Sequence, residues 1–179
     1  VTHFYNAMTT FHKVNGIVHA GVIEAAYLRE NVTIELIGDG CHVPKESMLL
    51  ANKIKGPDSI CLITDAMRAA GTDVSRSILG PEKGGVPVVI RNNVAQLTDL
   101  SSYAGSIATM DRVFRVAHLR YGIPVCEVSQ MLSLVPARLC GCIHRKGSLE
   151  RGKDADIVVM SADGYVRDVY IGGRRFNAA

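Results

Sequence analysis

The sequence lacks the features that would place it in a membrane or nucleic-acid-binding class. No apolar run approaches the about 18 residues of a membrane-spanning helix, and the first residues lack the charged-then-apolar pattern of a signal peptide. The formal net charge of +3 over 179 residues is too small to indicate nucleic acid or an anionic membrane as a partner. Internal repeats and low-complexity segments are also lacking. We therefore expect a protein that binds neither nucleic acid nor membranes.

Cysteine is present but forms no recognisable framework. The five cysteines are an odd number, and they are scattered among apolar residues. Reduced thiols are the simplest interpretation, and they predict a cytoplasmic location. Cys140 and Cys142 precede His144, but two thiols one residue apart at the end of a predicted helix make a poor chelate. We interpret Cys140 and Cys142 as buried structural residues.

Three apolar, strand-like segments each carry a histidine or aspartate close to small residues. These side chains are His3 in segment 1–8, His42 at the end of segment 34–42, and Asp65 in segment 60–67. Active sites of alternating α/β barrels lie at the carboxyl ends of the parallel strands. We therefore expect His3, His42 and Asp65 to converge at one edge of a parallel sheet.

The spacing of apolar residues alternates between strand and helix patterns. The expected elements are a strand at 1–8, a helix at 17–30, a strand at 32–37, a helix at 45–55 and a strand at 59–64. A hairpin of 86–90 with 94–98 follows, then helices at 106–121, at 125–134 and after Pro136, and finally two strands at 155–160 and 165–171. The first part predicts parallel strands with helical crossovers, which is an α/β fold.

The chain offers only three strand–helix units and a small β tail, whereas a closed eight-stranded barrel takes roughly 250 residues. Val1 lies inside a predicted strand, and no methionine precedes it. We expect the chain to be the C-terminal part of a longer protein, with an open sheet as the alternative.

His3 and Asp65 make chemical sense together. Neutral imidazole is a common ligand of zinc, and a carboxylate beside a metal-bound water can take its proton and later give it to a leaving amine. His42 could hydrogen-bond to a substrate. The spacing alone favours structural roles for His3 and Asp65, and for His42 it leaves a structural role and substrate binding equally open.

Other polar groups could bind a ligand near the same edge. Asn6 and Ala7 offer an amide and an exposed backbone N–H, which suit a sugar hydroxyl or a phosphate oxygen. Lys13 could add positive charge for an anion, or it could be a surface lysine. The segment 103–106 leads into a predicted helix, where free N–H groups favour an anion or a carbonyl oxygen and Ser106 could act as the N-cap.

Short motifs occur in a fixed order over essentially the whole chain. They are Thr2-His3-Phe4-Tyr5-Asn6-Ala7-Met8, His12-Lys13 ahead of Gly16, Asp39-Gly40-Cys41-His42-Val43, Thr64-Asp65-Ala66-Met67 with Ala70-Gly71, Ala104-Gly105-Ser106 with Thr109-Met110, Pro136-Ala137-Arg138, and Gly147 with Gly152-Lys153-Asp154-Ala155-Asp156. In this order they resemble the C-terminal half of the N-acetylglucosamine-6-phosphate deacetylase family, part of the amidohydrolase superfamily.

The resemblance implies a fold and a reaction. The fold would be the C-terminal part of a TIM-type (β/α)8 barrel over 1–145, with part of a small β-sandwich over 146–179. The reaction would be metal-dependent hydrolysis of N-acetylglucosamine 6-phosphate to glucosamine 6-phosphate and acetate. The metal would be divalent, either zinc or iron, and the protein would form homodimers or other oligomers.

The resemblance also implies roles for single residues. His3 matches a metal ligand and Asp65 the catalytic aspartate. The remaining matches are to substrate-binding residues, namely Asn6, Ala7, Lys13, His42, Tyr103, Ala104 and Gly105.

Three departures from the family pattern bear on these expectations. The family's other metal ligands lie in strands that precede the part matched here, so we expect the chain alone to be inactive. Lys13 stands where arginine is usual and Tyr103 where leucine is usual, which leaves open an amidohydrolase with another N-acyl or amide substrate. A non-catalytic association domain is a further alternative.

Overall fold

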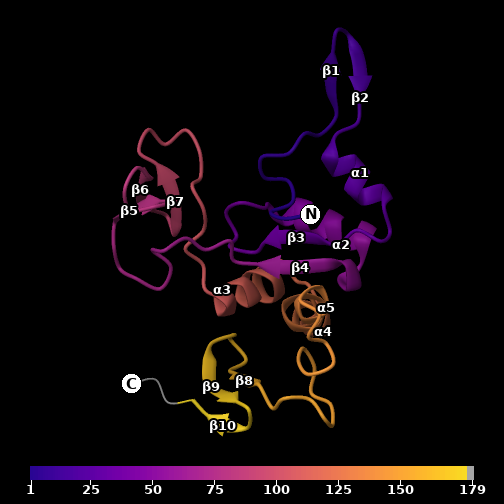
Figure 1. Ribbon diagram of the computed structural model, residues 1–179, viewed down its shortest axis with the longest axis vertical. Coiled ribbons are helices and arrows are strands. Elements are labelled where there is room, and N and C mark those ends of the chain that lie inside the picture. The colour runs from indigo at the N-terminus through magenta and orange to yellow at the C-terminus, as the bar shows by residue number, and fades with distance from the viewer. Residues whose placement is uncertain (177–179) are drawn as a thin grey trace.

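The computed structural model describes residues 1–176 (Figure 1). In chain order the elements are β1 His12–Val14, β2 Ile17–His19, α1 Val22–Leu28, β3 Ile34–Ile37, α2 Lys45–Lys55, the 3-10 turn η1 Pro57–Ser59, β4 Ile60–Ile63, β5 Arg76–Leu79, β6 Val86–Arg91, β7 Val94–Leu97, α3 Met110–Arg115, the π-helical turn η2 Val116–Arg120, α4 Val125–Ser129, the π-helical turn η3 Gln130–Leu134, α5 Val135–Leu139, β8 Ile157–Met160, β9 Val166–Ile171 and β10 Arg174–Arg175. None of the helices within residues 1–176 combines the length and the hydropathy needed to cross a bilayer.

A parallel pair of buried strands, β3 and β4, forms the centre of the molecule. Ile34 pairs with Ile60 and Ile37 pairs with Ile63. Helix α2 connects the two strands, and the C-terminal helices pack close to them (Figure 1). Apolar side chains from all these elements share one core, as expected for parallel strands that are covered on both faces. The strands predicted at 32–37 and 59–64 and the helix predicted at 45–55 are thereby confirmed, and so is the α/β class.

The strand predicted at 1–8 is wrong. Residues 2–7 form turns, because His3, Tyr5 and Ala7 have φ angles of 35°, 78° and 55°, which extended backbone does not allow. The segment nevertheless lies along β3. Phe4 donates its backbone N–H to the Glu35 carbonyl at 2.7 Å, and the Glu35 N–H donates to the Val1 carbonyl at 2.8 Å.

The helix predicted at 17–30 begins later than expected, at Val22. Its first residues instead pair with 12–14 in the β1–β2 hairpin. Asn15 and Gly16, with φ angles of 50° and 81°, make the two-residue turn that joins the strands. The hairpin projects from one end of the molecule (Figure 1).

Residues 67–104 form a separate lobe built on the antiparallel sheet β5–β6–β7. The predicted hairpin is confirmed as β6 and β7, and the structure adds β5. The lobe has a small core of its own around Val88 and Ala95. Its two connections to the body lie side by side, because Ser106 donates its N–H to the Asp65 carbonyl at 3.0 Å and accepts from the Met67 N–H at 2.8 Å.

The C-terminal helices differ from prediction at their ends. The helix predicted from 106 begins at Met110, and 125–139 is one continuous helix rather than two. The π-helical turn before Pro136 allows this, because the Val135 N–H bonds to the Gln130 carbonyl five residues earlier and the proline is accommodated in the next turn.

Strands β8 and β9 form the predicted antiparallel tail, extended by β10. The predicted division at 145/146 stays a prediction, and residues 177–179 of its second part lie outside the described residues.

Candidate active site

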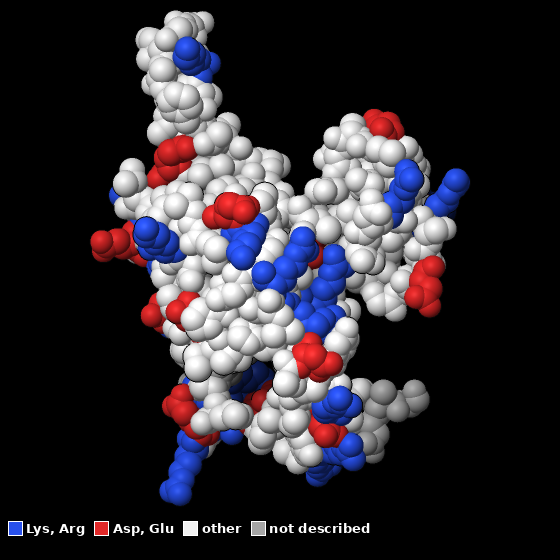
Figure 2. Space-filling view, turned by 180° about the vertical axis from the view of Figure 1, so that it is seen from behind, with Lys and Arg blue, Asp and Glu red and all other residues white. Residues whose placement is uncertain are grey.

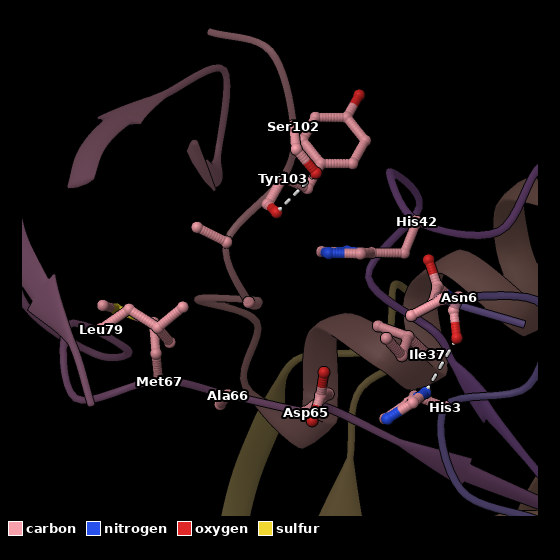
Figure 3. A pocket seen from close by; sticks show the side chains of 13 residues that line it. His3, Asn6, Ile37, His42, Asp65, Ala66, Met67, Leu79, Ser102 and Tyr103 are labelled. Atoms are coloured by element: carbon pink, nitrogen blue, oxygen red, sulfur yellow. Dashed lines mark hydrogen bonds between the residues drawn. The ribbon is translucent and has the colours of Figure 1, made fainter. Parts of the chain in front are cut away.

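A pocket of about 550 Å³ lies beyond the carboxyl ends of β3 and β4, between the body and the lobe (Figure 3). Its walls are formed by His3, Asn6, Ala7, Ile37, His42, Asp65, Ala66, Met67, Leu79, Ser102, Tyr103, Ala104 and Gly105. The structure thus brings together every residue that sequence reasoning selected for the site except Lys13. The lining also includes Ile37, Ala66, Met67, Leu79 and Ser102, which were not selected.

His3 is oriented by its own segment. Its Nδ1 lies 3.1 Å from the Asn6 carbonyl oxygen, which can only accept, so Nδ1 carries the proton. In the neutral ring Nε2 then keeps its lone pair. Figure 3 shows this second nitrogen turned toward the side of the cavity where Asp65 lies. A backbone carbonyl on one ring nitrogen is the usual arrangement for a histidine that binds a metal through the other.

Asp65 lies two residues after the end of β4. Its φ of 47° turns the chain toward the lobe, while its carbonyl accepts the N–H of Ser106. Within residues 1–176 its carboxylate has no hydrogen-bonding partner, and the residue is exposed to the pocket. The group is therefore available to a ligand.

Left-handed backbone is concentrated at this pocket. Three of its residues, His3, Ala7 and Asp65, are non-glycine residues with positive φ. Such conformations cost of the order of 1–3 kcal/mol each and cluster at functional sites, where the surrounding structure holds a side chain in a required direction. This feature supports a functional role for the pocket independently of residue type.

The described residues do not complete a metal site. No group of three histidine, cysteine, aspartate or glutamate side chains within 1–176 is arranged to hold a metal ion. Catalytic zinc usually takes three protein ligands. His3 fits as one of them, and Asp65 fits as a neighbouring carboxylate, but a full ligand set requires groups from outside this part of the chain.

His42 is held from behind by Asp39, a residue that sequence reasoning did not select. Asp39 Oδ2 accepts from His42 Nδ1 at 2.7 Å, and Oδ1 accepts from the backbone N–H groups of Cys41 and His42 at 2.8 and 2.9 Å. Burial alone would raise the pKa of Asp39, but these hydrogen bonds outweigh it and hold the pKa below its ordinary value. The three-residue spacing in Asp39-Gly40-Cys41-His42 is the signal that could have revealed it.

Tyr103 brings the lobe into contact with this pair. Its ring centroid lies 5.0 Å from that of His42, at an interplanar angle of 53°. In Figure 3 the imidazole of His42 extends into the cavity below the Tyr103 ring. Ala104 and Gly105 continue the same wall toward the bridge at Ser106.

Two expectations are corrected. Lys13 does not reach the pocket, because the β1–β2 hairpin carries it away from the body. Cys140 and Cys142 are not buried as expected: Cys140 is exposed, like Cys126, and Cys142 is half-buried, like Cys41, whereas Cys61 is buried. Burial raises the pKa of the Cys61 thiol to about 11.

Sequence comparison relates this chain to known hydrolases. The amidohydrolase family model matches residues 2–176. The N-acetylglucosamine-6-phosphate deacetylase of Danio rerio is 34% identical over 176 residues, which is 98% of this chain and 42% of the relative. The chain therefore spans about two fifths of the length of that relative.

Solved structures give the same result. The N-acetylglucosamine-6-phosphate deacetylase of Pasteurella multocida superposes with a TM-score of 0.87 at 29% identity, covering 99% of this chain and 44% of the other. A mutant of the Mycobacterium smegmatis enzyme in complex with N-acetyl-D-glucosamine-6-phosphate superposes with a TM-score of 0.85 at 31% identity, covering 97% of this chain and 44% of the other. The resemblance noted in the sequence is confirmed: the chain belongs to the amidohydrolase family.

Proposed function

We propose that this chain is the C-terminal part of a metal-dependent deacetylase that converts N-acetylglucosamine 6-phosphate and water into glucosamine 6-phosphate and acetate. The observation that carries the proposal is the convergence of His3, Asp65 and His42 on one pocket beyond the ends of β3 and β4. In this proposal residues 1–145 belong to a TIM-type barrel and residues 146–179 to a small β-sandwich. The free thiols are compatible with a cytoplasmic location.

Asp65 would perform the proton transfers. Its carboxylate takes a proton from the water that attacks the acetyl carbonyl, and it then gives the proton to the nitrogen as the C–N bond breaks. The absence of an internal hydrogen-bonding partner among residues 1–176 leaves both its oxygens available. A divalent metal ion, zinc or iron, would supply Lewis-acid activation of the water and the carbonyl, with His3 as one ligand.

The remaining pocket residues would orient the sugar. Asn6, with its side-chain amide, and the backbone N–H groups near Ala7 can bind hydroxyl or phosphate oxygens. His42 offers a ring nitrogen from the opposite wall. Tyr103, Ala104 and Gly105 would close the pocket from the lobe over the acetyl group.

The phosphate requires a source of positive charge that this pocket does not have. Its lining contains neither lysine nor arginine within the described part of the chain. Lys13 can therefore serve a phosphate only in the pocket of another copy, which agrees with a homodimer or larger oligomer. The same observation favours, as a second candidate, an amidohydrolase whose N-acyl substrate carries no phosphate.

A chimera tests the proposal. The N-terminal part of the Mycobacterium smegmatis enzyme, which the match does not cover, is joined to this chain, and acetate release from N-acetylglucosamine 6-phosphate is measured. We expect activity, and we expect Asp65→Asn to reduce kcat about 10³-fold without loss of folding. A folded chimera that hydrolyses only unphosphorylated N-acyl substrates would favour the second candidate.

The chain alone provides a further test. We expect it to bind substoichiometric zinc and to release no acetate, because the described residues contribute one imidazole ligand. A zinc content near one per chain together with deacetylation would contradict this expectation.

A further inference from the structure

Asp39 has no part in the proposed reaction, yet it is the only charged side chain that is buried within residues 1–176. A buried charge is costly unless it is paired and hydrogen-bonded. The carboxylate of Asp39 is fully buried, and the His42 side chain is 6% exposed. The pair lies directly behind the pocket wall, so its arrangement determines what His42 presents to a bound molecule.

The two oxygens of Asp39 have separate tasks. Oδ1 accepts two backbone N–H groups and thereby shapes the loop, whereas Oδ2 contacts only the imidazole. Arg112 holds the same loop from α3, because its Nη2 donates to the Asp39 carbonyl at 2.8 Å. The loop conformation therefore does not depend on Oδ2, and the ring orientation does.

The proton on the imidazole follows from this geometry. An ionised carboxylate can only accept, so Nδ1 of His42 must be the donor. The neutral ring then has an unprotonated Nε2 at its other end. Because His42 lines the pocket, with the Tyr103 ring against it, this nitrogen faces the ligand.

We propose that Asp39 is a positioning residue that fixes His42 with its proton on Nδ1, so that Nε2 accepts a hydrogen bond from a hydroxyl or amide N–H of the bound molecule. The identity of that molecule as an N-acetylated sugar rests on the proposed function. The tautomer does not, and it can be measured on the chain without any ligand.

Asp39→Asn is the matched test. The asparagine keeps Oδ1 for the two backbone N–H groups and replaces Oδ2 by a donor of the same size. The NH₂ group would then donate to Nδ1, which forces the proton onto Nε2. Long-range proton–nitrogen correlation spectra of the isotopically labelled chain, at a pH where the ring is neutral, report which nitrogen carries the proton.

We expect Nδ1–H in the unsubstituted chain and Nε2–H in Asp39→Asn. His118 is the internal control, because its Nδ1 bonds to the Ile123 carbonyl at 2.8 Å and should keep its proton there in both proteins. A proton on Nε2 of His42 in the unsubstituted chain would overturn the proposal, whatever the variant does. A His42 ring that keeps its proton on Nδ1 in Asp39→Asn would also overturn the proposal, provided that His118 shows that the variant has the native fold.

The chimera adds a functional readout. In Asp39→Asn the Nε2–H of His42 would face a donor group of the substrate. We therefore expect KM to rise about tenfold or more and kcat to change less, because the hydrogen bond to the substrate is lost. An unchanged KM would contradict the acceptor role. An inactive chimera would count against the proposed function alone, because the tautomer result stands by itself.

Discussion

Ala7 shows that pocket residues carry a conformational cost. Its φ of 55° lies in the left-handed region, which costs an L residue about 1–2 kcal/mol. Glycine avoids this cost but loses about 0.5–1 kcal/mol of chain entropy on folding. We therefore expect Ala7→Gly to raise the free energy of unfolding by about 0.5–1 kcal/mol in urea denaturation.

The control for this substitution is Ala25→Gly, in the exposed middle of α1. There the backbone is helical, so glycine should lower the free energy of unfolding by about 1 kcal/mol. If both substitutions destabilise equally, the left-handed conformation of Ala7 is not maintained in solution.

Glu24 should make the base of the hairpin sensitive to acid. Hydrogen bonds from the Thr10 hydroxyl and then from the Gly21 N–H lower the pKa of Glu24 from 4.5 to about 2. A lowered pKa means that the stabilisation is complete above the unfolded value and is lost as the pH falls from about 4.5 to about 2. The Gly21 amide resonance should titrate in this window, and Glu24→Gln should abolish that titration while leaving the amide of Ala108 unchanged.

Site residues were predictable from the sequence where their position depends on the segment that they belong to. His42 and Asp65 could be found because each follows an apolar segment that ends at one edge of the parallel sheet. His3 was found although its own segment forms turns and not the predicted strand. Asp39 was missed because the three-residue spacing to His42 is compatible with a contact but does not show that the carboxylate is buried. Lys13 was misplaced because its position depends on how the hairpin leaves the body, which is a tertiary property.

The close contact between the end of β3 and α3 requires a residue without a side chain, Gly38. Gly38 follows β3, and a Cβ atom there would lie 2.3 Å from Cγ1 of Val113. We expect Gly38→Ala to lower the free energy of unfolding by about 1–3 kcal/mol, as other overpacked cores do. Val113→Ala opens space at this point, so the double variant should be more stable than additivity predicts. Strict additivity in the double-mutant cycle would contradict the contact.

Helices and strands were predictable where all the local sequence signals favoured the same secondary structure. Helix α2 has its proline before the first turn and Gly56 after the last, and its bounds match the prediction. Prediction failed where signals competed. Residues 17–19 fit the helical periodicity of 17–30, but the preceding Asn15-Gly16 turn pairs them with β1 instead. Pro136 is typical of a helix break, yet the π-helical turn before it keeps the helix continuous.

The hairpin makes self-association the expected state of the molecule. It carries Phe11, Val14, Ile17 and Val18, each about half-exposed or more, and Figure 2 shows it as a projection with few charged atoms. Contiguous apolar surface of this kind usually marks an interface. We expect the chain to sediment faster than a monomer, and we expect Phe11→Ser with Ile17→Glu to shift it toward the monomer.

Leu149→Glu is the control for this experiment. Leu149, at 74%, is more exposed than the four apolar hairpin residues, but it lies in a loop far along the chain. Its substitution should leave the sedimentation coefficient unchanged. A response to Leu149→Glu equal to that of the hairpin variant would place the interface elsewhere.

The lobe joins the body through two neighbouring points, Ala66 and Ser106, which form a parallel β-bridge. Strand β4 is held by its pairing with β3, which does not involve the lobe. Insertions and deletions there would reshape the mouth of the cavity while the carboxylate of Asp65 stays where β4 puts it. Under the proposed function, a different lobe would therefore change which substrates fit the pocket while leaving Asp65 in place.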